Sequence, residues 1–89
     1  MACVYILYSK SKNKFYTGSS RKNNSRTRLK SHNIGKVKST KSGRPWILIH
    51  TKIYSTYREA RKREIFLKSG AGRKWIKGRF GHYKEDNKK

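Results

Sequence analysis

Glu64 is the residue whose position most strongly suggests chemistry. Residues 56–68 predict a helix in which Tyr57, Ala60, Glu64 and Leu67 recur at spacings of three and four. Residues at this spacing share one helix face, so Glu64 interrupts an otherwise apolar stripe. A carboxylate there is a candidate ligand for a hard cation such as Mg²⁺, which can take one protein carboxylate and fill its other positions with water and phosphate.

Acidic residues are scarce, and this makes Glu64 stand out further. The 89 residues contain only four Asp and Glu. Two of these fall in the polar stretch after residue 81, and Glu59 has a capping role described below. Glu64 is therefore the carboxylate left for chemistry. The structural alternative is an ion pair with Arg61, Lys68 or a neighbour across a sheet.

Arg28 and His32 form a second candidate pair. They are four residues apart in a predicted helix, so they share a face, with the apolar Leu29 beside them. A guanidinium can neutralise charge on phosphoryl oxygens, and an imidazole can act as acid, base or hydrogen-bond donor near neutral pH. Ordinary decoration of a helix in a basic protein also explains this spacing.

The charge of the chain identifies the class of partner. Lys and Arg number 25, which gives a formal net charge of +21. Such a charge attracts polyanions, and nucleic acid is the commonest in a cell. A membrane-surface protein would carry one basic amphipathic helix, whereas Lys and Arg here run through every segment. Charge alone does not separate DNA from RNA, or binding from cleavage.

The predicted strands lie in the first part and the middle of the chain. Residues 4–8 and 15–18 are β-branched and aromatic runs around a polar turn, which predicts a hairpin. Residues 46–54 predict a third strand. The stretch between, 36–45, is basic and poor in apolar residues, so we expect a loop close to phosphates, with Lys38, Lys41 and Arg44 as nucleic-acid contacts.

Three helices are expected. The first begins at Ser25 as its cap and ends at Gly35 in the left-handed conformation. The second begins with a capping box of Thr56 and Glu59, and residues 69–72 end it. Residues 73–80 predict a short final helix, followed by a frayed tail.

The length permits one small domain, expected over residues 1–80, with a flexible basic tail over 81–89. Cys3 is the single cysteine and can form neither an internal disulfide nor a multi-thiolate zinc site. No stretch approaches the roughly 18–20 apolar residues of a membrane span, and the first residues lack a basic leader. These features predict a cytoplasmic protein.

Five short motifs follow one another along residues 2–77. They are Cys3-Val4-Tyr5, Tyr16-Thr17-Gly18, Arg28 with His32, the loop 38–46, and Arg63-Glu64 through Gly70. Each is weak alone, but their order and spacing are specific. Together they resemble the GIY-YIG nuclease superfamily, and within it the small stand-alone YhbQ-like (UPF0213-type) group.

The resemblance implies an α+β fold, a small three-stranded antiparallel sheet flanked by helices, with one shallow site for a phosphodiester. It implies a catalytic set of Tyr5, Tyr16, Arg28, His32 and Glu64. Glu64 would hold Mg²⁺ or Mn²⁺, and a tyrosine near Tyr5, or a water it contacts, would activate the nucleophile. Arg28 would neutralise phosphoryl charge, and Gly18 would keep the approach open for the nucleic-acid backbone. We expect the positive field and the metal to lower the tyrosine pKa.

The leading functional hypothesis is a divalent-metal-dependent DNA endonuclease. One small domain offers few base contacts, so we expect recognition of structured or damaged DNA, as in DNA repair, with little sequence readout. A monomer is favoured. The alternative is a non-catalytic nucleic-acid-binding module, for example on RNA. A nuclease that needs a partner chain for targeting would use the same site residues.

Overall fold

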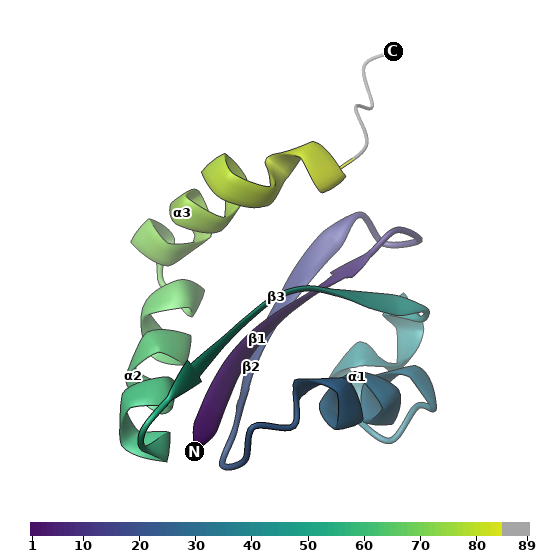
Figure 1. Cartoon of the computed structure of the whole chain (residues 1–89). Coiled ribbons are helices and arrows are strands. Elements are labelled where there is room, and N and C mark those ends of the chain that lie inside the picture. The colour runs from purple at the N-terminus through teal and green to yellow at the C-terminus, as the bar shows by residue number, and fades with distance from the viewer. Residues whose placement is uncertain (85–89) are drawn as a thin grey trace.

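A three-stranded antiparallel sheet organises the molecule (Figure 1). The computed structural model describes residues 1–84. β1 (Ala2–Ser9) is central, between β2 (Lys14–Ser20) and β3 (Trp46–Tyr54), and both neighbours run antiparallel to it. The predicted α+β class and the three strands are confirmed.

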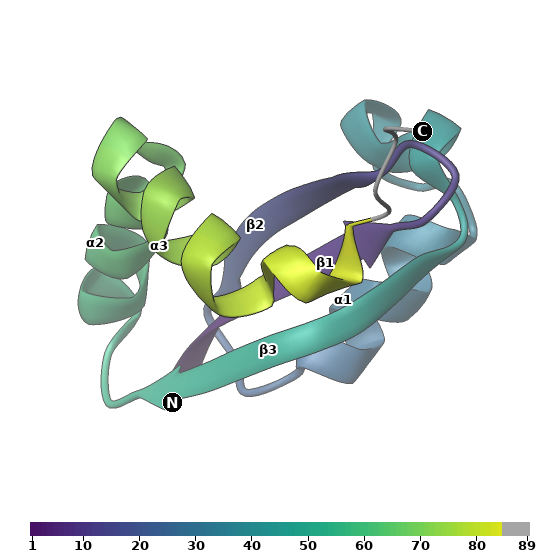
Figure 2. The ribbon, with the colours of Figure 1, turned by 90° about the horizontal axis from the view of Figure 1, so that it is seen from above.

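The two faces of the sheet carry two separate cores. All eight residues of β1 are buried, and they alternate between the faces. Its even-numbered apolar residues pack against α2 (Tyr57–Lys68) and α3 (Gly70–Phe80). Its odd-numbered ones lie on the face of α1 (Ser25–Asn33), with Trp46 and Leu29. Figures 1 and 2 show α1 on one side of the sheet and the helix pair on the other.

The predicted start of α2 and the predicted stop after α1 are confirmed, whereas the predicted cap of α1 is wrong. Thr56 and Glu59 form the capping box at the start of α2. Gly35 follows α1 with φ +84°, the left-handed conformation expected there. The cap of α1, however, is Asn24 rather than Ser25, and its side chain makes no capping hydrogen bond. Ser25 is instead buried in the first turn.

Two further segments differ from expectation. The predicted loop contains η1 (Lys38–Gly43), a 3₁₀ helix. The final helix starts at Gly70 rather than residue 73, because the Ser69 hydroxyl caps it at the Gly72 amide. Gly72 is required by packing, since a Cβ there would clash with the Phe66 carbonyl oxygen. Gly72 thus permits the close approach between α2 and α3.

The chain does not fray directly after α3. Gly81–Tyr83 form η2, a short 3₁₀ turn, and the Tyr83 ring lies 5.9 Å from the Tyr8 ring. Burying aromatic surface holds this turn against the hairpin. Residues 85–89 of the expected tail lie outside the described residues. Among residues 1–84, none of the helices has the length and apolar character needed to cross a membrane.

Candidate active site

Tyr5, His32 and Tyr16 form an aromatic cluster on the α1 face of the sheet. The Tyr5 hydroxyl lies 3.2 Å from Nε2 of His32, and both residues are buried. The centre of the Tyr16 ring, on β2, lies 4.9 Å from the centre of the His32 imidazole. The sequence motifs that were far apart in the chain therefore meet here, because β1 and β2 pair and α1 packs on the same face of the sheet, mainly over β3 and β1.

A hydrogen-bond chain fixes the tautomer of His32. The Thr40 hydroxyl donates to the Val37 carbonyl at 3.3 Å, so it accepts from His32 Nδ1 at 2.7 Å. With its proton on Nδ1, the ring has a free lone pair on Nε2, which accepts from the Tyr5 hydroxyl. Burial, with Arg28 nearby, lowers the pKa of His32, so the ring is neutral at physiological pH. His32 thus accepts a hydrogen bond from the Tyr5 hydroxyl as a neutral ring.

This arrangement predicts the titration of His32. Its imidazole is expected to stay neutral to a pH below the usual value near 6.5, with the proton on Nδ1. Folding favours the neutral ring, so the His32 contribution to stability is present above that value and is lost as the pH falls through the lowered pKa. Ring ¹⁵N chemical shifts report both properties. A ring protonated at pH 7, or a proton on Nε2, would contradict the assignment.

The pKa of Tyr5 is raised, so the expectation that the positive charge of the protein lowers it is wrong. Burial has the largest effect on this pKa, and it raises the pKa because it disfavours the charged tyrosinate. The nearby Tyr16 and Glu64 raise it too. Arg28 lies beside the Tyr5 hydroxyl and opposes the shift without cancelling it. The positive charge of the whole chain is spread over the surface, where solvent screens it. Tyr5 is therefore a neutral phenol, and its hydroxyl donates to Nε2 of His32.

Gly18 lies directly beneath the Tyr5 ring. A Cβ at this position would be 2.5 Å from the Tyr5 hydroxyl oxygen and 2.6 Å from its ring carbon. The space that was expected to admit the nucleic-acid backbone is occupied by this ring. In the structure, glycine is needed here so that Tyr5 can cross β2 and reach the cluster.

Replacing Gly18 by Ala is expected to lower the free energy of unfolding by about 1–3 kcal/mol, because the methyl group overpacks against Tyr5. Gly78→Ala is the matched control. A Cβ on Gly78 meets nothing within 4 Å, so alanine should stabilise α3 by about 0.5–1 kcal/mol. Denaturant unfolding measures both changes, and equal stability of Gly18→Ala and wild type would contradict the contact.

Glu64 points inward from α2 toward β2, and its side chain is almost fully buried. It accepts a hydrogen bond from the Ser19 hydroxyl, and it pairs with Arg61 Nη1 at 2.8 Å and Lys68 Nζ at 3.0 Å. Burial alone would raise the pKa of Glu64, but these three donors outweigh it and the pKa is lowered. The carboxylate is therefore ionised at neutral pH, and the ion pairs named as the structural alternative are present.

The surroundings of Glu64 fit a hard divalent cation with one protein ligand. The described residues include no cluster of three His, Cys, Asp or Glu, so such a cation would complete its shell with water and phosphate. Arg61 and Lys68 pair with this carboxylate from half-exposed positions on the helix surface, so a cation bound by Glu64 would displace these two side chains from it. Glu64 thus offers an ionised oxygen ligand beside a solvent-facing edge.

Lys68 connects Glu64 to the aromatic cluster. Its ammonium lies 3.0 Å from the Glu64 carboxylate and 5.7 Å from the centre of the Tyr16 ring. The Tyr5 pKa also responds to the charge on Glu64. Ser19, which binds Glu64, follows Gly18 in β2, so Glu64 approaches this strand from the α2 face of the sheet, whereas Tyr5 lies on the α1 face. Tyr5, Tyr16, Arg28 and His32 therefore lie together on the α1 face, and Lys68 at the β2 edge links them to Glu64.

The three basic residues predicted to contact nucleic acid lie on or just after η1. Lys38, Lys41 and Arg44 are exposed, and Arg44 Nε donates to the Lys41 carbonyl at 2.8 Å. Trp46 anchors this segment through its indole N–H, which donates to the Thr40 carbonyl. Since Thr40 binds His32, the basic segment is fixed to the same side of the sheet as the aromatic cluster.

Two residues of the site were missed by the sequence analysis. Thr40 orients His32, but the two lie eight residues apart in different elements. Ser19 binds Glu64 across 45 residues. The only signal for Ser19 was its place directly after Gly18 in the second motif, and nothing in the local sequence marked Thr40.

Comparison with known proteins identifies the family. The model of the GIY-YIG catalytic domain matches residues 1–77. The chain belongs to the GIY-YIG family. It is also 39% identical over 67 residues to UPF0213 protein SH2523 of Staphylococcus haemolyticus (strain JCSC1435). The matched stretch covers 74% of this chain and 78% of that protein. No solved structure matches this GIY-YIG chain significantly. The family is a nuclease superfamily of phosphodiester hydrolases, which generally use divalent metals.

Proposed function

We propose that this GIY-YIG protein is a divalent-metal-dependent DNA endonuclease with little sequence readout, directed to structured or damaged DNA. The observation that supports the proposal is an ionised, buried Glu64 whose partner Lys68 lies against Tyr16, the ring next to the Tyr5 and His32 pair. A carboxylate for a hard cation and a positioned proton acceptor are two of the groups that phosphodiester hydrolysis requires.

Glu64 would hold Mg²⁺ or Mn²⁺ as the protein ligand. When bound, the cation would stabilise negative charge on the phosphoryl oxygens. Tyr5 would receive the proton of the attacking water as its own proton passes to Nε2 of His32, and the Thr40 hydroxyl holds the imidazole for this transfer.

Arg28 would bind the scissile phosphate. Its Nε is buried and has no hydrogen-bond partner within residues 1–84. A buried donor without a partner costs free energy, which a phosphate oxygen would recover by accepting from it. The guanidinium would then neutralise charge that grows on the phosphate during hydrolysis.

The substrate preference rests on the size and charge of the domain. Lys38, Lys41 and Arg44 are exposed donors suited to phosphate oxygens, which carry no sequence information. The chain would act as a cytoplasmic monomer whose nuclease domain spans residues 1–80.

A non-catalytic nucleic-acid-binding module is the second candidate. One observation favours it, because both oxygens of Glu64 are already paired with cations of the protein. Such a module would bind DNA or RNA with a steep dependence on salt and would cleave neither.

The test is incubation of the purified protein with plain, nicked, flap and junction DNA and with structured RNA. Each substrate is assayed with Mg²⁺, with Mn²⁺ and with EDTA. We expect cleavage of DNA in the presence of metal and none in EDTA, with branched substrates cut faster than plain duplex. Binding without cleavage under every metal condition would instead establish the binding module.

A further inference from the structure

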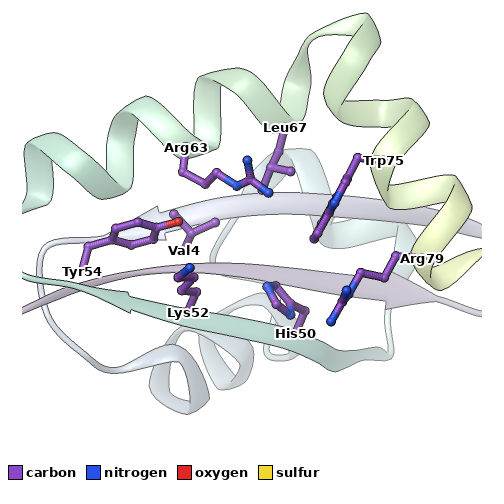
Figure 3. Close-up of a pocket in the computed structure, with 8 residues that line it drawn as sticks. All are labelled: Val4, His50, Lys52, Tyr54, Arg63, Leu67, Trp75 and Arg79. Atoms are coloured by element: carbon purple, nitrogen blue, oxygen red, sulfur yellow. The ribbon is translucent and has the colours of Figure 1, made fainter.

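A second cavity, away from the candidate active site, lies between β3 and the two helices α2 and α3. It has a volume of about 230 Å³. Figure 3 shows Arg63 and Arg79 reaching into it from the helices, with Lys52 and His50 on the strand below. Its remaining wall is apolar and aromatic, with Trp75 between the two guanidinium groups. No carboxylate of residues 1–84 lines this space.

The three cations of this cavity have no acidic partner among the described residues. The two described carboxylates are occupied elsewhere, Glu59 in a helix cap and Glu64 with Arg61 and Lys68. Aromatic rings hold the cations instead. The Arg63 guanidinium lies 4.9 Å from the Trp75 ring centre, that of Arg79 lies 5.5 Å from the same ring, and Lys52 lies 5.7 Å from the Tyr54 ring.

The pKa of His50 responds to the positive charges of the cavity. Its ring lies 6.0 Å from Trp75 and 5.4 Å from Phe80. Burial lowers the pKa of His50, and Arg79, Arg63 and Lys52 lower it further. These three side chains are therefore close enough to act together on one point of the cavity.

The cavity is separate from the site around Glu64. In the register of the sheet, Val4 of β1 lies opposite Ser19 of β2 on one side and opposite Lys52 of β3 on the other. Ser19 binds Glu64, whereas Lys52 lines the cavity, so the central strand lies between them. A ligand in the cavity would not contact the candidate catalytic residues.

We propose that this cavity is a second phosphate-binding site, formed by Arg63, Arg79 and Lys52. A planar guanidinium matches two phosphate oxygens at once, and two of them with an ammonium suit a multiply charged oxyanion. The volume lies below the range of roughly 300–1,000 Å³ typical of drug-sized ligands, so it suits a phosphate with its sugar. That group would come from a nucleic-acid strand or from a free nucleotide.

The test follows the His50 ring by NMR at constant ionic strength in EDTA, so that no metal-dependent cleavage occurs. Inorganic phosphate, a deoxynucleoside 5′-monophosphate, a short DNA oligonucleotide and a glutamate-rich peptide are titrated in turn. A bound phosphate is expected to raise the pKa of His50, because it neutralises the three cations. A response to phosphate or mononucleotide supports a free ligand as the source, and a response to the oligonucleotide alone supports a strand.

Arg79→Gln is expected to weaken this response about tenfold, since it removes one charged donor from the phosphate. Arg58→Gln is the matched control, because Arg58 is equally exposed on α2 and does not line the cavity. Glu64→Gln is expected to leave the response intact whether or not the protein cleaves DNA. The proposal is overturned if no phosphate compound shifts His50, if the peptide acts equally well, or if the two arginine variants weaken binding to the same extent.

Discussion

Replacing Glu64 by Gln is expected to reduce the rate of DNA cleavage by at least roughly 100-fold, because the metal would lose its ionised protein ligand. Glutamine has the size of glutamate and still accepts the hydrogen bond of Ser19, so the side chain should stay in place. Initial rates on a labelled flap or junction DNA at saturating Mg²⁺ measure the effect.

Glu59→Gln is the control for this change. Glu59 is the other described carboxylate of α2 and acts in the capping box with Thr56, at the exposed start of the helix. Its replacement removes the same charge from the same helix, so cleavage should remain near the wild-type rate. Equal activity of wild type and Glu64→Gln would remove the metal-binding role.

Tyr5→Phe is the second change with a large expected effect. It should slow cleavage about 10²–10⁴-fold, the usual loss for a positioned proton-transfer group. The phenyl ring still fills the space over Gly18, but Nε2 of His32 loses its donor. An unsatisfied buried group costs about 1–3 kcal/mol, so stability is measured alongside the rate.

Tyr8→Phe controls for the loss of a hydroxyl from the same strand. The Tyr8 hydroxyl donates to Asn13 in the hairpin turn, and its side chain lies on the other face of the sheet. Cleavage by Tyr8→Phe should stay close to wild type. If Tyr5→Phe cleaves as fast as Tyr8→Phe, the phenol takes no part in proton transfer.

Much of the fold was predictable because its signals are local. The capping box of Thr56 and Glu59, the stop at Gly35 and the apolar runs of the strands each depend on neighbours in sequence. The start of α3 was not predictable from the sequence, because glycine has a low helix propensity. Gly72 is needed in α3 because α2 packs against it and leaves no room for a Cβ. That contact forms only in the tertiary structure.

The same distinction applies to the candidate site. The inward position of Glu64 followed from helix periodicity, and its burial confirms it. The sign of the Tyr5 pKa shift did not follow, because the net charge of the chain says nothing about the burial of one phenol. The role of Thr40 depends on how η1 folds back onto α1, which Trp46 fixes from the start of β3.

A double-mutant cycle shows whether Glu64 and Tyr5 serve one phosphodiester. Cleavage rates are measured for wild type, Glu64→Gln, Tyr5→Phe and the double variant on the same junction DNA. Groups that act as a unit have strongly non-additive effects, so the double variant should be about as slow as the slower single variant. Losses that simply multiply would show that the two residues act independently and would contradict a shared catalytic centre.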